Sequence, residues 1–172
     1  MSKHKLIFLT SLIFLLARTI IPGQDRGYIV EVGQFAPDFT ALLENGDSFN
    51  LSSNLGNVVM LQFTASWCGV CREEMPFIES EIYQKLKEKD FVLIGIDRDE
   101  LEDVVSAYAR KMKITYPLAL DPGSNIFSLF ALKESGVTRN VIIDREGRII
   151  YLTRLFEREE FDKMKEIIFN QF

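Results

Sequence analysis

The chain of 172 residues is poor in the side chains that build metal sites and imidazole-based catalysis, with two cysteines and one histidine. A structural zinc site needs about four ligands, and two cysteines fall short of that number. The histidine is His4, which leaves the protein if the N-terminal segment is removed on export. Ser-His and Cys-His catalytic arrangements are then excluded from the remaining domain.

The N-terminus also lacks a hydrophobic run as long as a membrane-spanning helix requires, about 20 residues. Residues 6–17 are mostly apolar, two lysines precede them, and Arg18 interrupts the run. This pattern predicts a secretory signal peptide over residues 1–23. The alternative is an uncleaved N-terminal anchor, and only then would the protein contact a membrane. Both interpretations place the following domain, residues 27–172, outside the cytoplasm, with a bacterial periplasm as the expected compartment.

Positive charge is in short supply. The chain has 20 lysines and arginines against 25 aspartates and glutamates, and the signal segment holds three of the basic residues and none of the acidic ones. An acidic domain lacks the basic surface that holds phosphates, so nucleic acid is excluded as a partner. The content of 47% hydrophobic and 26% charged residues is ordinary for a soluble globular protein.

Hydrophobic patterning predicts an α/β fold. Asn45-Gly46-Asp47 predicts the turn of an N-terminal hairpin within residues 37–51. Apolar runs bounded by turn residues predict strands at residues 58–63, 91–96, 118–120, 140–143 and 148–152. Apolar residues at three- and four-residue spacing predict helices that end near Asp90, cover 101–112 and 125–132, and close the chain. This order predicts one domain with a central mixed sheet and helices on both faces.

The two cysteines, Cys68 and Cys71, stand three residues apart, between the predicted strand 58–63 and a predicted helix. A helix start presents unpaired N–H groups and the positive end of the helix dipole, and both favour the thiolate at Cys68. Cys68 is therefore the predicted nucleophile. The sulfur of Cys71, one turn further on, can attack a mixed disulfide on Cys68, which makes it the predicted resolving thiol.

A resemblance to a known family covers nearly all of the chain after the signal segment. It is carried by residues 63–76, which contain Trp67-Cys68-Gly69-Val70-Cys71, and by residues 33–39 and 142–147. These segments resemble the thioredoxin superfamily, in particular its exported TlpA/ResA-like redoxin branch of thiol-disulfide oxidoreductases. The resemblance implies a thioredoxin-like fold with a redox-active disulfide between Cys68 and Cys71, at the C-terminal end of a strand.

The resemblance also implies roles for residues around the pair. Glu74 matches the glutamate that acts as acid and base in the family. Burial would raise the pKa of this glutamate into the range useful for proton transfer. The alternative for Glu74 is a solvated first-turn acid stabilised by the helix dipole. Pro76 matches the proline that kinks the family's helix, with a tolerated first-turn proline as the alternative. Trp67 would cover the active cysteine, and its alternative is an ordinary core aromatic.

Two positions depart from the family pattern. Thr138 stands where the family carries a cis-proline facing the disulfide. A cis peptide bond before threonine would cost about 3–4 kcal/mol, so a trans bond and a different substrate-facing surface are expected. Val70 replaces the proline or histidine of well-known relatives inside the cysteine motif, and residues at that place tune the redox potential.

The function implied by the resemblance is thiol-disulfide exchange on protein disulfides, more in the reducing than in the oxidising direction, as part of cell redox homeostasis. No metal and no bound cofactor are implied. The expected partners are a protein disulfide substrate and an exported or membrane-bound thiol carrier that donates electrons, because exported compartments lack the cytosolic reductant pool.

Two other functions stay open. A peroxiredoxin-like thiol peroxidase shares this fold and could use Arg139, although Arg139 could equally be a solvated loop cation. Ala65 and Leu61 stand where such enzymes typically carry a threonine and a proline. The third possibility is a non-enzymatic module with a structural disulfide, although a bridge between residues three apart removes little unfolded-state entropy.

Overall fold

The computed structural model describes residues 26–172. The predicted signal peptide, residues 1–23, lies outside the described residues, and the extent of the domain, 27–172, stays a prediction. Within the described part of the chain, no helix combines the length and the apolar character needed to cross a membrane.

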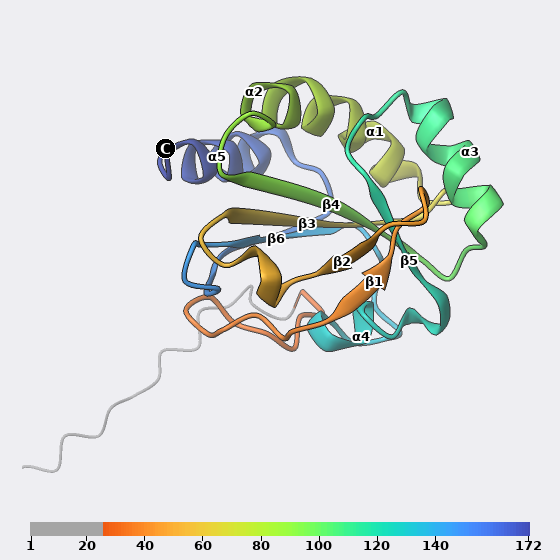
Figure 1. Ribbon diagram of the computed structural model, residues 1–172, viewed down its shortest axis with the longest axis horizontal. Coiled ribbons are helices and arrows are strands. Elements are labelled where there is room, and N and C mark those ends of the chain that lie inside the picture. The colour runs from red at the N-terminus through yellow and green to blue at the C-terminus, as the bar shows by residue number, and fades with distance from the viewer. Residues whose placement is uncertain (1–25) are drawn as a thin grey trace, which may run out of the picture.

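A mixed sheet of five strands forms the centre of the molecule (Figure 1). Its order is β5-β4-β3-β6-β7, with the strands β3 (Val58–Thr64), β4 (Phe91–Arg98), β5 (Leu118–Asp121), β6 (Arg139–Ile143) and β7 (Ile149–Arg154). β3, β4 and β5 are parallel to one another, whereas β6 is antiparallel to both of its neighbours, β3 and β7. β3 is buried along its whole length because it is the middle strand and both its faces are covered. The predicted mixed sheet is confirmed.

Three helical segments cover one face of the sheet (Figure 1). The first begins directly after Cys68 and consists of α1 (Gly69–Phe77), a π-helical stretch η2 (Ile78–Tyr83) and α2 (Gln84–Leu86). The other two are α3 (Glu102–Met112) and α5 (Arg158–Phe169). Their apolar faces pack on the sheet around the fully buried Met60, Ile142, Ile78 and Phe161. The three- and four-residue spacing in the sequence predicted the buried side of the first helix correctly, whereas in the second Leu101 and Val104 of the predicted apolar stripe are exposed.

The opposite face is covered by a hairpin and short helices. The hairpin consists of β1 (Thr40–Leu42) and β2 (Ser48–Asn50) and forms a separate two-stranded sheet. Its buried side chains pack with α4 (Phe127–Phe130) against the sheet, and the ring of Phe130 contacts those of Phe39 and Phe63. Two 3-10 turns, η1 (Ser52–Asn54) and η3 (Pro122–Ser124), complete this layer. Helices and hairpin thus enclose both faces, as predicted.

Some predicted bounds were wrong by a few residues. β4 extends to Arg98 rather than ending at Ile96, so Asp97 lies inside the sheet. An aspartate and an arginine after an apolar run suggest a strand end, but pairing with β3 and β5 continues through them. The short helix α4 covers only part of the predicted 125–132. Within β4, the absence of a side chain at Gly95 makes room for Leu118, whose side chain would have to shift if a Cβ were added there.

Candidate functional site

The two cysteines form a disulfide at the junction of β3 and α1. Cys68 is the residue that caps the start of α1, and its sulfur accepts a hydrogen bond from the backbone N–H of Cys71 at 3.2 Å. An N–H at a helix start stabilises negative charge on the atom it faces. In the described part of the chain, the N–H of Cys71 is the only backbone group that donates to either sulfur. It therefore favours the thiolate at Cys68.

The two sulfurs differ in access. Cys68 is 8% exposed and Cys71 is fully buried under the first turn of α1. An incoming disulfide can reach only a sulfur that has some exposed surface. The geometry therefore distinguishes an outer cysteine from an inner one, in the same order as the sequence-based prediction.

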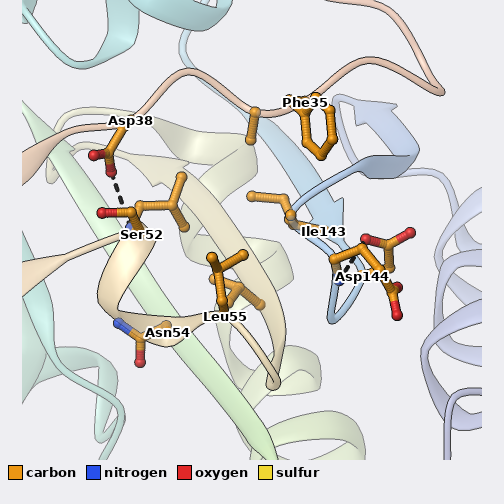
Figure 2. Close-up of a pocket in the computed structure, with 12 residues that line it drawn as sticks. Phe35, Asp38, Ser52, Asn54, Leu55, Ile143 and Asp144 are labelled. Carbon is orange, nitrogen blue, oxygen red and sulfur yellow. Dashed lines mark hydrogen bonds between the residues drawn. The ribbon is translucent and has the colours of Figure 1, made fainter.

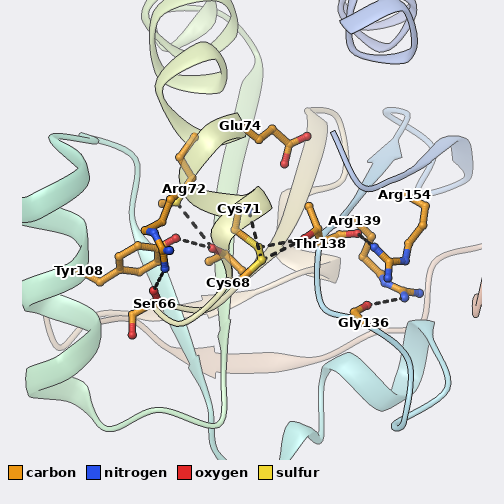
Figure 3. Close-up of a disulfide and its surroundings, with 12 residues drawn as sticks. Ser66, Cys68, Cys71, Arg72, Glu74, Tyr108, Gly136, Thr138, Arg139 and Arg154 are labelled. Atoms are coloured by element: carbon orange, nitrogen blue, oxygen red, sulfur yellow. Dashed lines mark hydrogen bonds between the residues drawn. A yellow bond between two sulfur atoms is a disulfide. The ribbon is translucent and has the colours of Figure 1, made fainter. Parts of the chain in front are cut away.

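Thr138 lies against both sulfurs. Its Oγ1 is 3.1 Å from the sulfur of Cys68 and 3.2 Å from that of Cys71 (Figure 3). No cis peptide bond occurs among residues 26–172, so the bond before Thr138 is trans, as its cost predicted. The carbonyl of Thr138 accepts hydrogen bonds from the backbone of Leu155 at 3.2 Å and the guanidinium of Arg154 at 3.0 Å. A hydroxyl thus stands within 3.2 Å of both sulfurs of the disulfide.

Glu74 is buried on α1, with its carboxyl group in the interior and 1% of its surface exposed. One carboxyl oxygen accepts a hydrogen bond from Asn140 on β6 at 2.6 Å, and the other has no hydrogen-bond partner in the described residues. Burial raises the pKa of Glu74 to about 7, and the hydrogen bond from Asn140 offsets part of that rise. The alternative of a solvated first-turn acid is therefore wrong.

Glu74 does not hydrogen-bond either sulfur within the described structure. Figure 3 shows it further along α1 than the cysteines, on the side away from Tyr108. Its Asn140 partner also bonds Thr153 on β7 at 2.9 Å. The carboxyl group is therefore held by the antiparallel half of the sheet while α1 carries the cysteines.

Trp67 and Pro76 occupy the two ends of the active-site segment. The side chain of Trp67 is 60% exposed, so the interpretation as a core aromatic is wrong, and whether it covers Cys68 during exchange stays a prediction. Pro76 lies at the eighth position of α1, so it is not a first-turn proline. Proline has no N–H to donate, and the regular α-helical pattern gives way to the π-helical stretch two residues later.

Arg139 is fully buried at the start of β6, which contradicts the interpretation as a solvated loop cation. Its guanidinium donates to the backbone carbonyls of Gly27 at 3.1 Å and Gly136 at 2.7 Å, and lies over the rings of Tyr28 and Phe127. Burial lowers the pKa of Arg139 to about 10. These contacts give Arg139 a structural role in holding the segment that precedes Thr138.

Sequence reasoning missed a group of buried polar side chains near the C-terminal ends of β3 and β4. Gln62 and Thr64 alternate with apolar residues on β3, and this period of two is visible in the sequence within a run that otherwise reads as apolar. Asp97 pairs with Thr64 across the parallel strands, but it lay beyond the predicted end of its strand. All three share the face of the sheet beneath α1.

The described residues contain no cluster of histidine, cysteine, aspartate and glutamate that could hold a metal ion. A mostly apolar cavity of about 180 Å³ lies at the opposite end of β3, beside Val59 (Figure 2). Its walls come from residues 35–38, from the segment after β2, and from the turn between β6 and β7. It is separate from the disulfide.

Comparison with known proteins connects this geometry to an enzyme family. The model of the AhpC/TSA family matches residues 32–152. The thiol-disulfide oxidoreductase ResA of Bacillus cereus is 28% identical over 155 residues, which cover 87% of this chain and 88% of ResA.

Two solved structures extend the likeness. A protein from Bacteroides thetaiotaomicron, provisionally named a protein disulfide isomerase, is 57% identical with a TM-score of 0.82, over 84% of this chain and 92% of that one. A protein from Chlorobium tepidum, provisionally named thiol:disulfide interchange protein DsbE, is 26% identical with a TM-score of 0.73, over 83% of this chain and 98% of that one. The family match spans well over half of the chain, and the two cysteines form a disulfide at the start of α1. The chain therefore belongs to the AhpC/TSA family and is a thioredoxin-fold thiol-disulfide oxidoreductase related to ResA.

Proposed function

We propose that Cys68 is the attacking sulfur of this oxidoreductase and that Cys71 is the resolving one. In the reduced enzyme, the Cys68 thiolate attacks a substrate disulfide, forms a mixed disulfide, and expels one substrate sulfur as a thiolate that takes up a proton. Cys71 then loses its proton and attacks the sulfur of Cys68. The Cys68–Cys71 disulfide forms, and the second substrate sulfur leaves reduced. The observation that carries this order is that Cys68 keeps 8% of its surface exposed whereas Cys71 is fully buried.

Glu74 serves as the proton-holding group of this cycle. Cys71 must lose a proton in the resolving step, and Glu74 follows it by one helical turn. Its pKa of about 7, raised chiefly by burial, suits a group that accepts and returns protons near neutral pH. Because no direct hydrogen bond joins Glu74 to a sulfur in the described structure, the proton would pass through a water molecule or after a small movement of α1. Trp67, Pro76 and Thr138 support this site without taking part in the proton transfer.

The enzyme acts in the reducing direction outside the cytoplasm, on protein disulfides. Support comes from the predicted signal peptide and from the relatives that carry the names ResA and DsbE. Electrons would come from an exported or membrane-bound thiol carrier, because an exported compartment has no reductant pool of its own. The reaction as written requires neither metal nor bound cofactor. A redox potential measured against glutathione tests the direction, since a reductant of this kind should equilibrate below the glutathione couple.

Trapping the mixed disulfide tests the order of the two cysteines. Reduced Cys71→Ser, incubated with oxidised insulin, should accumulate a covalent enzyme–substrate adduct that mass spectrometry maps to Cys68. Reduced Cys68→Ser is the matched control, and it should form no adduct and reduce no insulin. Adduct formation by Cys68→Ser, together with none by Cys71→Ser, would reverse the assignment.

A further inference from the structure

Asp97 is a buried acid that the exchange mechanism above does not use. It lies near the C-terminal end of β4, beside Thr64 of β3, and is fully buried. Neither of its carboxyl oxygens receives a hydrogen bond from any donor in the described residues. An ionised carboxylate left without donors in the interior is strongly destabilising, so the site favours the protonated acid.

The groups around Asp97 connect it to the active-site segment. Glu100, in the loop after β4, accepts hydrogen bonds from the backbone N–H of Ser66 at 2.5 Å and from its hydroxyl at 2.6 Å. Ser66 stands two residues before Cys68, and its carbonyl accepts a hydrogen bond from Arg72 of α1 at 2.6 Å. Figure 3 shows Ser66, Arg72 and Tyr108 together on the side of the disulfide opposite Thr138. Glu100 is thus the anchor that holds the turn between β3 and α1.

We propose that Asp97 is a positioning residue for Cys68: its protonated carboxyl group donates a hydrogen bond to Glu100, and Glu100 in turn fixes Ser66 and the turn that carries the cysteine. The proton on Asp97 gives the carboxylate of Glu100 a hydrogen-bond donor in place of a second negative charge. The proposal rests on the proposed function only in taking Cys68 as the attacking sulfur, because the contacts of Ser66 exist irrespective of the chemistry.

The same arrangement makes the turn sensitive to pH. Burial, together with a smaller contribution from the nearby carboxyl group of Glu100, raises the pKa of Asp97 to about 8. Above that pH, Asp97 loses its proton to water, and two negative carboxylates face each other. Arg72 and Tyr108 are further titratable groups at this place, and Asp103 and Lys111 of α3 line the same surface hollow as Ser66. Arg72 contacts Ser66, and Tyr108 bonds Thr64 at 3.1 Å, so neither neutralises Asp97 directly.

Trp67 offers a direct measurement, because it is the chain's one tryptophan and follows Ser66 immediately. We expect the fluorescence of Trp67 in the oxidised protein to change between pH 6 and 9.5, with a midpoint near pH 8. The oxidised state has no thiol to titrate, so this signal is independent of exchange activity. Asp97→Asn keeps a donor toward Glu100 and cannot ionise, and it should abolish the transition.

Two further variants separate Asp97 from its surroundings. Glu74→Gln is the control, because Glu74 titrates near pH 7, and it should leave the transition near pH 8 in place. Glu100→Gln removes the repelling charge and should move the midpoint below pH 8. The carboxyl carbon of Asp97, followed by NMR in the unmutated protein, should titrate with the same midpoint. A transition that persists unchanged in Asp97→Asn, or a carboxyl signal that titrates at the ordinary aspartate value, would overturn the proposal while leaving the roles of the cysteines untouched.

Discussion

The face of the sheet beneath α1 and α5 has an apolar end and a polar end. At the start of β3 and along its neighbours, Val58, Met60, Leu93 and Ile142 pack against apolar helix residues. Two residues further toward the disulfide, the same face carries Gln62, Thr64, Asp97 and Asn140, all of them buried. The backbone pairing is continuous across this boundary, so only the side chains distinguish the two ends.

The two ends contribute differently to stability because burial has opposite effects on the free energy of apolar and polar side chains. Apolar groups gain free energy when they leave water, whereas polar groups lose it unless they are paired. The described buried polar atoms without hydrogen-bond partners lie, apart from one arginine nitrogen, at the polar end: Gln62 Nε2, Glu74 Oε2, both oxygens of Asp97, and Asn140 Oδ1. The apolar end therefore stabilises the fold, and part of that stability offsets the cost of burying, at the polar end, groups that take up and release protons near neutral pH.

The largest expected effect is a loss of stability on mutation at the apolar end. Met60 is fully buried there, and Met60→Ala should lower the free energy of unfolding by about 2–5 kcal/mol through lost contacts and a cavity. The rate of exchange with a disulfide substrate, measured well below the denaturation midpoint, should change little because Met60 and the two cysteines belong to separate core clusters. Urea denaturation and an insulin assay at the same pH check both parts. A large loss of rate with stability intact would break the division.

The next effect concerns the polar end and depends on pH. Burial raises the pKa of Glu74 from its unfolded value of 4.5 to about 7, so the folded state holds the proton more tightly than the unfolded state does. The stability from this group is complete below pH 4.5 and is lost as the pH rises to 7, in total about 3 kcal/mol. The free energy of unfolding of Glu74→Gln, relative to that of the unmutated protein, should therefore rise by about that amount between pH 4 and pH 8.

Denaturation curves at several pH values measure this difference, and Glu73→Gln is a matched control because Glu73 is the exposed neighbour on the same helix. Glu74→Gln should also slow exchange near neutral pH and flatten the pH dependence of its rate. If Glu74→Gln followed the unmutated protein at every pH, the carboxyl group would not be the buried titrating group described above.

The smallest effect lies at the boundary with the disulfide. Thr138→Val keeps the shape of the side chain but removes the hydroxyl that contacts both sulfurs, which should cost about 1 kcal/mol of interaction. The redox potential should shift and exchange should slow by less than tenfold, whereas Thr138→Ser should restore the original behaviour. Equal potentials for all three proteins would show that the hydroxyl has no energetic contact with the sulfurs.

The accuracy of the predictions made from the sequence differs between the apolar end and the polar end. Period and spacing located the strands and the helices because apolar burial dominates there, and the Trp67-Cys68-Gly69-Val70-Cys71 motif located the disulfide. The polar end was harder to predict. Gln62 was predicted as part of one apolar strand, whereas Thr64 and Asp97 each lay just beyond the predicted end of a strand. Their burial depends on the parallel register of β3 and β4, which is a tertiary property that local sequence does not encode.

The claim on which the rest depends is that Cys68, at the start of α1, is the reactive sulfur. Treating the reduced protein at pH 7 with less than one equivalent of iodoacetamide, followed by peptide mapping, tests it directly. The geometry predicts that the label is found on Cys68, which has exposed surface and a backbone N–H donor, and not on the fully buried Cys71. A label found mainly on Cys71, or divided equally between the two, would contradict it.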